Sequence, residues 1–162
     1  MRIRPARTED LEQLLEIYND AVVNSTASWD LEPWTPAEHA EWYATKAASA
    51  HPVIVADEGG TVLGYAAYGP FRSKAGYART MEHSVYVRQD QRGRGLGRAL
   101  LVAIIEAARA DGVHALIGGL DSDNAVSLAL HHSLGFAEVG RLSEVGRKFD
   151  RWLDLVLVQL IL

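Results

Sequence analysis

A glycine-rich stretch between Gln91 and Arg98 carries the clearest chemical signal in the chain, with the order Gln-Arg-Gly-Arg-Gly-Leu-Gly-Arg. Glycine lets the backbone turn tightly and lets a ligand approach the amide groups closely. A helix that begins directly after the turn adds the positive end of its dipole, and the arginines add full charges. Together these features predict a site for a pyrophosphate group. The alternative is a basic glycine turn at a helix start that binds nothing.

The spacing of the glycines excludes two common phosphate-binding motifs. A Walker loop continues with Gly-Lys-Ser/Thr, whereas Arg98-Ala99 follows Gly97 here. A dinucleotide-binding fingerprint needs Gly-x-Gly-x-x-Gly, whereas this turn reads Gly-x-Gly-x-Gly and lies in the middle of the chain.

The turn needs a strand before it and a helix after it, and both are predicted. Residues 82–87 are rich in β-branched and aromatic residues, and apolar residues recur at helical spacing from Leu96 to Ala107. We expect strands near Ile3 and over 53–56, 62–68, 116–120, 136–142 and 152–160, with a loop containing Arg147, Lys148 and Phe149 between the last two. Further helices are expected after a Thr8 cap, from the Thr35–Glu38 capping box towards Ala50, and over 124–134.

This order predicts one α/β domain over residues 1–162, with a mixed central β-sheet flanked by helices on both faces. The chain has 162 residues, 48% of them apolar, which suits a single globular core. The net charge of −5 argues against nucleic acid as a partner. The absence of cysteine excludes disulfides and cysteine-based zinc sites. We find no signal peptide and no apolar run of about 18 residues, and we expect a cytoplasmic protein that does not associate with membranes.

Several segments resemble one family. From Arg92 to Gly97 the chain reads Arg-x-x-Gly-x-Gly, the acetyl-coenzyme A signature of the GNAT acetyltransferases, and the order of elements is also theirs. Residues 18–22, 82–87, 130–136 and 145–154 resemble the phosphinothricin acetyltransferase branch. Within it, they are most similar to bacterial L-amino acid N-acyltransferases that acetylate methionine sulfone and methionine sulfoximine.

This resemblance implies an enzyme, an N-acetyltransferase of the GNAT fold, with acetyl-CoA as its co-substrate and no metal. The backbone of the strand would bind the pantetheine arm, the glycine-rich turn would bind the diphosphate, and an asparagine at the start of the last long helix would contact the cofactor. The expected cofactor-binding residues are Val85, Tyr86, Val87, Arg92, Gly93, Arg94, Gly95, Leu96, Gly97, Arg98, Asn124 and Ser127.

Two side chains are expected to move protons. An amine is mostly protonated at neutral pH, so that acetyl transfer needs a base, and Glu82 occupies the position of the family's proposed base. The alternative is that Glu82 pairs with Arg79 at a strand end. His131 stands where the phosphinothricin branch has a histidine and would donate a proton to the departing thiolate; the alternative is a half-exposed helix histidine.

The substrate is expected to contact Trp29, Arg72, Tyr77, Lys148 and Phe149. Arg72 is the first choice for an α-carboxylate, with a solvated loop charge as the alternative. Relatives tend to carry an aromatic-Arg pair before the base, whereas this chain has Tyr77-Ala78-Arg79.

The expected function is acetylation of the α-amino group of a small amino acid or analogue, such as methionine sulfoximine, methionine sulfone or phosphinothricin. Two alternatives stay open: a non-catalytic acyl-CoA sensor, and an acetyltransferase acting on peptide or protein N-termini. The relatives are usually homodimers, and the same is expected here.

Overall fold

The computed structural model describes all residues, Met1–Leu162. The chain folds into two compact units, each built from segments that are separate in the sequence. The first contains Met1–Gly69 and His83–Ala107, and the second contains Pro70–Glu82 and Ala108–Leu162.

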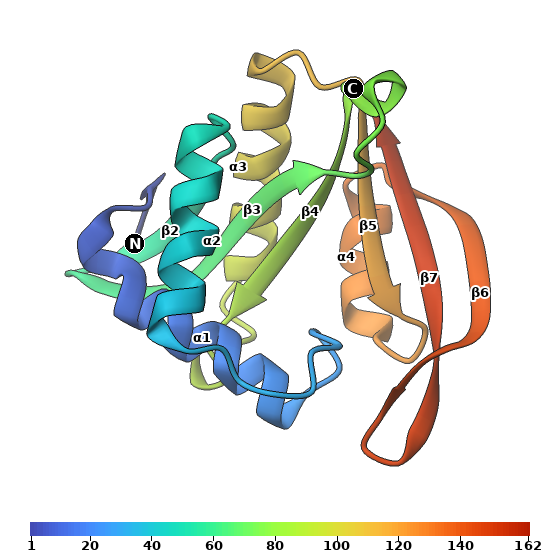
Figure 1. Cartoon of the computed structure of the whole chain (residues 1–162), viewed down its shortest axis with the longest axis horizontal. Helices are drawn as coiled ribbons and strands as arrows, with labels where there is room; N and C mark the ends of the chain where they lie inside the picture. Colours follow the sequence, from blue (N-terminus) through green and yellow to red (C-terminus); the bar gives the residue numbers. More distant parts are fainter. The chain divides into compact units, whose positions relative to one another are not determined.

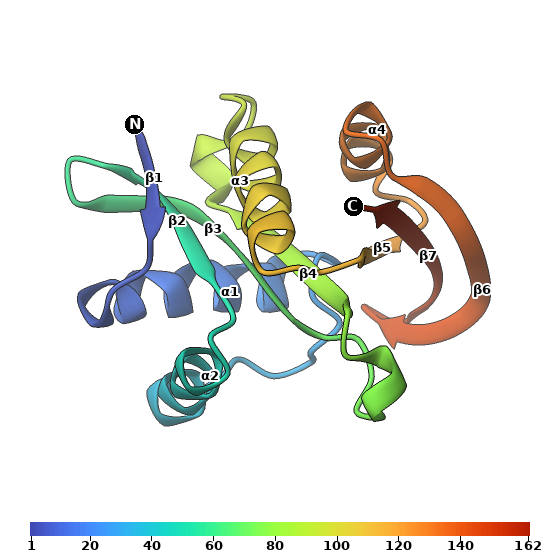
Figure 2. The same ribbon diagram turned by 90° about the horizontal axis from the view of Figure 1, so that it is seen from above.

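The first unit contains strands on which helices pack from both sides. Its elements are β1 (Arg2–Pro5), a 3₁₀ turn (Thr8–Asp10), α1 (Leu11–Asn24), α2 (Pro36–Ala48), β2 (Val53–Glu58), β3 (Thr61–Pro70), most of β4 (Thr80–Val87), a second 3₁₀ turn (Gln89–Gln91) and most of α3 (Leu96–Ala110). The helices α1 and α2 cover one face of these strands and α3 covers the other (Figure 2). The antiparallel pairs β1–β2 and β2–β3 build the outer part of its sheet.

Apolar packing between α1 and the strands forms one hydrophobic cluster of this unit. Its buried residues are Leu14, Ile17, Val53, Val55, Val62, Tyr65 and Ala67. A buried ionic network lies beside β1 in the same unit. Arg4 donates hydrogen bonds to both carboxylate oxygens of Asp10 at 2.7 and 2.9 Å, and to Asp57 at 2.8 Å. These bonds raise the pKa of Arg4 and lower that of Asp10.

The helix starts show one confirmed and one wrong cap. Thr35 accepts from the Glu38 amide at 3.2 Å while Glu38 accepts from the Thr35 amide at 2.7 Å, as the capping box predicts. Thr8, however, lies within the 3₁₀ turn and does not cap α1. Asp10 accepts from the Arg7 amide instead, because Arg4 holds its carboxylate there.

The second unit is built on antiparallel strands with one helix against them. It contains a 3₁₀ turn (Ala75–Tyr77), β5 (Ala115–Asp121), α4 (Ala125–Ser133), β6 (Ala137–Lys148) and β7 (Arg151–Ile161). Strand β7 pairs with β5 on one edge and with β6 on the other, and α4 lies beside these strands (Figure 1). Thr80–Glu82, the beginning of β4, pairs with β5 in parallel.

Hydrogen bonding therefore runs through seven strands in the order β1-β2-β3-β4-β5-β7-β6. The mixed α/β fold and the order of elements are as predicted. One boundary is wrong: β6 continues to Lys148, so only Phe149 and Asp150 form the loop, and Arg147 and Lys148 belong to a strand. None of the helices is long and apolar enough to span a bilayer.

Candidate functional site

The glycine-rich turn has the backbone that its sequence predicts. Gly93 and Gly95 both have φ of +78°, in the left-handed region that side chains disfavour. Helix α3 begins at Leu96, and the first N–H groups of a helix have no acceptor within it. The turn thus presents donors at the positive end of a helix dipole.

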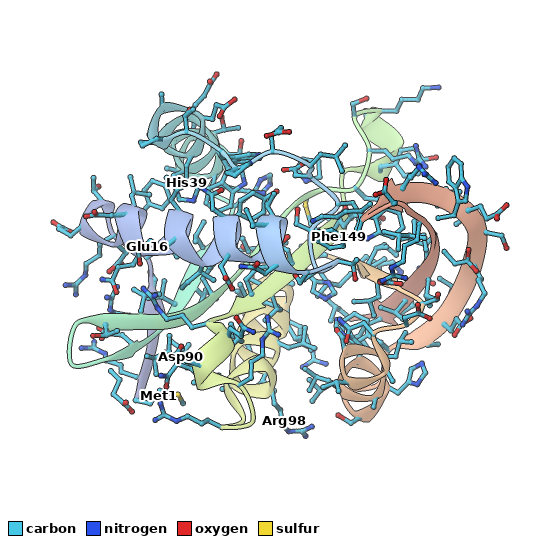
Figure 3. All side chains as sticks on the ribbon, turned by 90° about the horizontal axis from the view of Figure 1, so that it is seen from below. Met1, Glu16, His39, Asp90, Arg98 and Phe149 are labelled. Carbon is cyan, nitrogen blue, oxygen red and sulfur yellow. The ribbon has the colours of Figure 1, made fainter.

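The space beside this turn is open. A Cβ built on Gly93 or Gly95 would meet no protein atom within 4 Å, so a side chain there would extend into this open space. Arg92, Arg94 and Arg98 are exposed, and Arg98 extends away from the first turn of α3 (Figure 3). Arg94 donates to Glu58 at 3.1 Å and to the side chain of Gln91.

Tyr86 of β4 packs into a group of aromatic side chains. Its ring lies 5.4 Å from that of Tyr18 and 5.4 Å from that of Tyr65. Its carbonyl oxygen is 2.7 Å from where a Cβ on Gly64 would stand, so only glycine fits there. Val85, Tyr86 and Val87 continue β4 beyond Glu82, the last residue that pairs with β5.

Glu82, which the sequence predicts as the base, has a raised pKa. The residue is exposed, but neighbouring protein atoms displace part of the water around its carboxyl, and this desolvation raises its pKa. The charge of Arg72 acts in the opposite direction, which places the two groups near each other. The alternative partner Arg79 instead donates to the Gly112 carbonyl at 3.4 Å, and no ion pair joins it to Glu82.

His131 is buried rather than half-exposed, with 4% of its surface accessible. Its Nδ1 lies 2.7 Å from the Ser127 carbonyl oxygen, and because that oxygen can only accept, Nδ1 carries a proton. The neutral ring therefore has its lone pair on Nε2. Burial lowers the pKa of His131, so the neutral form dominates at pH 7. As a donor to a thiolate, the ring must first take up a proton.

Asn124 and Ser127 form the cap of α4. The Asn124 Oδ1 accepts from the Ser127 amide at 3.1 Å, which leaves its Nδ2 group to donate to a ligand. Cofactor contact and helix capping, two alternatives in the sequence, are therefore compatible.

The expected substrate residues fall into both units. In the second, Arg72 stacks on Phe71 at 5.1 Å, and Tyr77 contacts the same ring edge-on at 6.0 Å. Lys148 is buried, and its ammonium lies 5.2 Å from the centre of the Phe149 ring. Trp29 is partly exposed in the first unit.

Some ordered polar groups were not predicted from the sequence. Asp30 accepts from the Trp34 indole at 2.8 Å and from the Tyr18 hydroxyl. Burial and this carboxylate raise the pKa of Tyr18 to about 12. The Asp121–Arg151 contact of the second unit is another case. In the sequence, only a Tyr-Asn-Asp run and closely spaced aspartates point to these polar groups. Neither pattern shows which residues they contact.

No cluster of three or more His, Cys, Asp or Glu side chains is arranged to hold a metal ion.

The acetyltransferase (GNAT) family profile matches residues 11–136, and the chain belongs to this family of acyltransferase enzymes. It is 51% identical over 159 residues to an L-methionine sulfoximine/L-methionine sulfone acetyltransferase of Pseudomonas aeruginosa, covering 98% of this chain and 92% of the relative. It is 44% identical over 160 residues to an L-amino acid N-acyltransferase of Escherichia coli, covering 99% and 93%. A putative acetyltransferase from Salmonella typhimurium, solved with its cofactor acetyl-CoA, superimposes with a TM-score of 0.97 at 43% identity, covering 99% of this chain and 93% of that one.

Proposed function

We propose that this enzyme transfers the acetyl group of acetyl-CoA to the α-amino group of a small amino acid or analogue, of the methionine sulfoximine or methionine sulfone type. The carboxyl of Glu82 carries the proposal, because its raised pKa and the nearby charge of Arg72 suit a base that meets an amino acid. The names of the Pseudomonas and Escherichia relatives support the substrate class.

The first unit provides groups for the coenzyme. The amides from Arg92 to Arg98 would hold the diphosphate, and the backbone of Val85–Val87 would pair with the pantetheine arm as an added strand does. The left-handed glycines and the open space beside them support this assignment. When bound, acetyl-CoA supplies the activated acetyl group.

The second unit provides the groups that move protons. Glu82 accepts a proton from the substrate ammonium, directly or through a water, and so exposes the nitrogen lone pair. His131 can take up a proton on Nε2 and deliver it to the leaving sulfur. Because burial lowers the pKa of His131, the ring, once protonated, gives up its proton more readily than a free imidazolium does.

Substrate recognition would combine charge with apolar contact. Within the second unit, Arg72 pairs with the α-carboxylate, Lys148 provides a second cation, and Tyr77 and Phe149 contact the side chain. We further propose that the enzyme acts as a cytoplasmic homodimer without a metal.

Release of coenzyme A thiol, followed with a chromogenic reagent, tests the function. The panel contains the common amino acids, methionine sulfone, methionine sulfoximine, phosphinothricin and a short peptide. Release with an amino acid or analogue, with the acetylated product confirmed by mass spectrometry, is expected. Release with the peptide alone would instead indicate an N-terminal acetyltransferase, and binding of acetyl-CoA without release for any amine would indicate a sensor.

A further inference from the structure

The turn between β5 and α4 is built around a buried carboxylate that the proposed reaction does not use. Asp121 ends β5, and only 3% of its side chain is exposed. A buried carboxylate is costly unless hydrogen bonds and opposite charge compensate it. The groups that contact Asp121 therefore indicate its role.

Asp121 shapes the turn that leads into Asn124. Its Oδ1 accepts from the Asp123 amide at 3.1 Å, and its backbone carbonyl accepts from the Asn124 amide at 3.0 Å. Both bonds fold the chain back within three residues. The second also restrains the backbone of Asn124, whose side chain then caps α4 through Ser127.

Arg151 holds the same turn from β7. Its guanidinium nitrogens lie 3.8 Å from the Asp121 carboxylate and 3.2 Å from that of Asp123. A further bond ties the turn to β7, from the Ser122 amide to the Asp154 carbonyl at 3.0 Å. Arg151 thus supplies positive charge to the buried carboxylate and fixes the turn against the strand that packs beside it.

We propose that Asp121, held by Arg151, is a positioning residue that orients the side-chain amide of Asn124 for coenzyme binding. The proposal rests on the function proposed above. Asn124 has φ of −83° and ψ of 69°, outside the helical region, and its Oδ1 and carbonyl accept from α4. On its other side, its backbone amide donates to the Asp121 carbonyl, and the Asp121 side chain holds this part of the turn in place through the Asp123 amide and Arg151. Because the Asn124 Oδ1 accepts the capping bond from Ser127, the position of the Asn124 backbone determines where its Nδ2 points.

Calorimetric titration with coenzyme A tests this without an amine substrate. Asp121→Asn keeps the shape of the side chain but removes the charge that attracts Arg151. We expect its Kd for coenzyme A to rise about tenfold, as for loss of one well-placed hydrogen bond to a ligand. Asp123→Asn is the matched control, because Asp123 contacts the same arginine but 74% of its side chain is exposed; its Kd should stay unchanged.

A double-mutant cycle separates positioning from a general structural role. Asn124→Ser keeps an oxygen for the cap but lacks the N–H₂ donor. If Asp121 acts through Asn124, then the double variant binds coenzyme A no more weakly than Asn124→Ser alone. Additive losses would overturn the proposal, as would an unchanged Kd in Asp121→Asn. Should Asp121→Asn fail to fold, Arg151→Gln serves in the same cycle.

These failures are distinct from failure of the proposed function. If the wild-type chain binds coenzyme A but the Asp121 and Asp123 variants behave alike, only the positioning role is wrong. If the wild-type chain binds no coenzyme A, both proposals are wrong. KM for acetyl-CoA should rise in Asp121→Asn, whereas KM for the amine should not.

Discussion

Replacing Gly95 with valine should abolish coenzyme binding while leaving a folded protein. At φ of +78°, a β-branched residue is strained, and the left-handed conformation costs about 1–2 kcal/mol. For a chain of this size that corresponds to a fall in Tm of roughly 2–8 °C. The valine methyl groups would enter the open space beside the turn, where the diphosphate is proposed to lie.

Gly112→Val is the matched control. Gly112 follows the other end of α3 with φ of +71°, and an added Cβ would make only an ordinary contact with Arg79, at 3.9 Å. Both variants should therefore lose similar stability, but only Gly95→Val should lose coenzyme binding.

The assay compares thermal unfolding with and without coenzyme A. At a concentration of 100 times Kd, a ligand that binds only the native state adds about 2.7 kcal/mol. Wild type and Gly112→Val should thus gain roughly 5–11 °C, whereas Gly95→Val should gain nothing. An equal gain in Gly95→Val would refute the assignment of this turn to the coenzyme.

Two further predictions concern substrate recognition and stability. Arg72→Ala should raise KM about tenfold or more for amines that carry a carboxylate, because a hydrogen bond to a charged group is lost; if simple amines of similar size are affected equally in steady-state assays, Arg72 does not bind the carboxylate. His39 is buried, its Nε2 has no partner, and burial lowers its pKa below 6.5, so the unfolded chain binds a proton that the native protein does not. The free energy of unfolding should therefore fall as pH drops below about 6.5. Measured by urea unfolding, it should fall less between pH 7 and 5 in His39→Phe than in the wild type. Parallel falls in both proteins would contradict this.

Local signals in the sequence were the most reliable guide to structure. The Thr35–Glu38 capping box and the two left-handed glycines of the turn depend on neighbours within a few residues, and the structure has both. Thr8 failed as a cap because Arg4 draws Asp10 into a buried ion pair. A contact between a strand and the last residue of a 3₁₀ turn leaves no local pattern.

Strand pairing explains the error near the end of the chain. The polar run from Glu144 to Lys148 reads as a loop, but Lys148 pairs with Arg151 across a two-residue turn. Phe149 and Asp150 both adopt positive φ there; aspartate tolerates this conformation, but phenylalanine does not predict it. Register is determined by the partner strand, and here it also shifts between Leu142 and Gly146.

The candidate site shows the same division. Residue type and position led to the prediction of Glu82 and His131 as site residues. They did not show the nearness of Arg72 to Glu82, nor the Ser127 carbonyl that decides which nitrogen of His131 carries the proton. Burial and the nearness of residues distant in sequence are properties of the folded chain. They decide the pKa values on which the proposed roles depend.

The most direct test of the account is the turnover of Glu82→Gln at saturating acetyl-CoA and amine. Because desolvation raises the pKa of Glu82, its ionised form opposes folding above pH 4.5, so the glutamine variant should be at least as stable at pH 7. The account predicts that kcat falls by about 10²-fold or more while the Kd for coenzyme A is unchanged. An unchanged kcat in a folded variant that binds coenzyme A would contradict the role of Glu82 as the base.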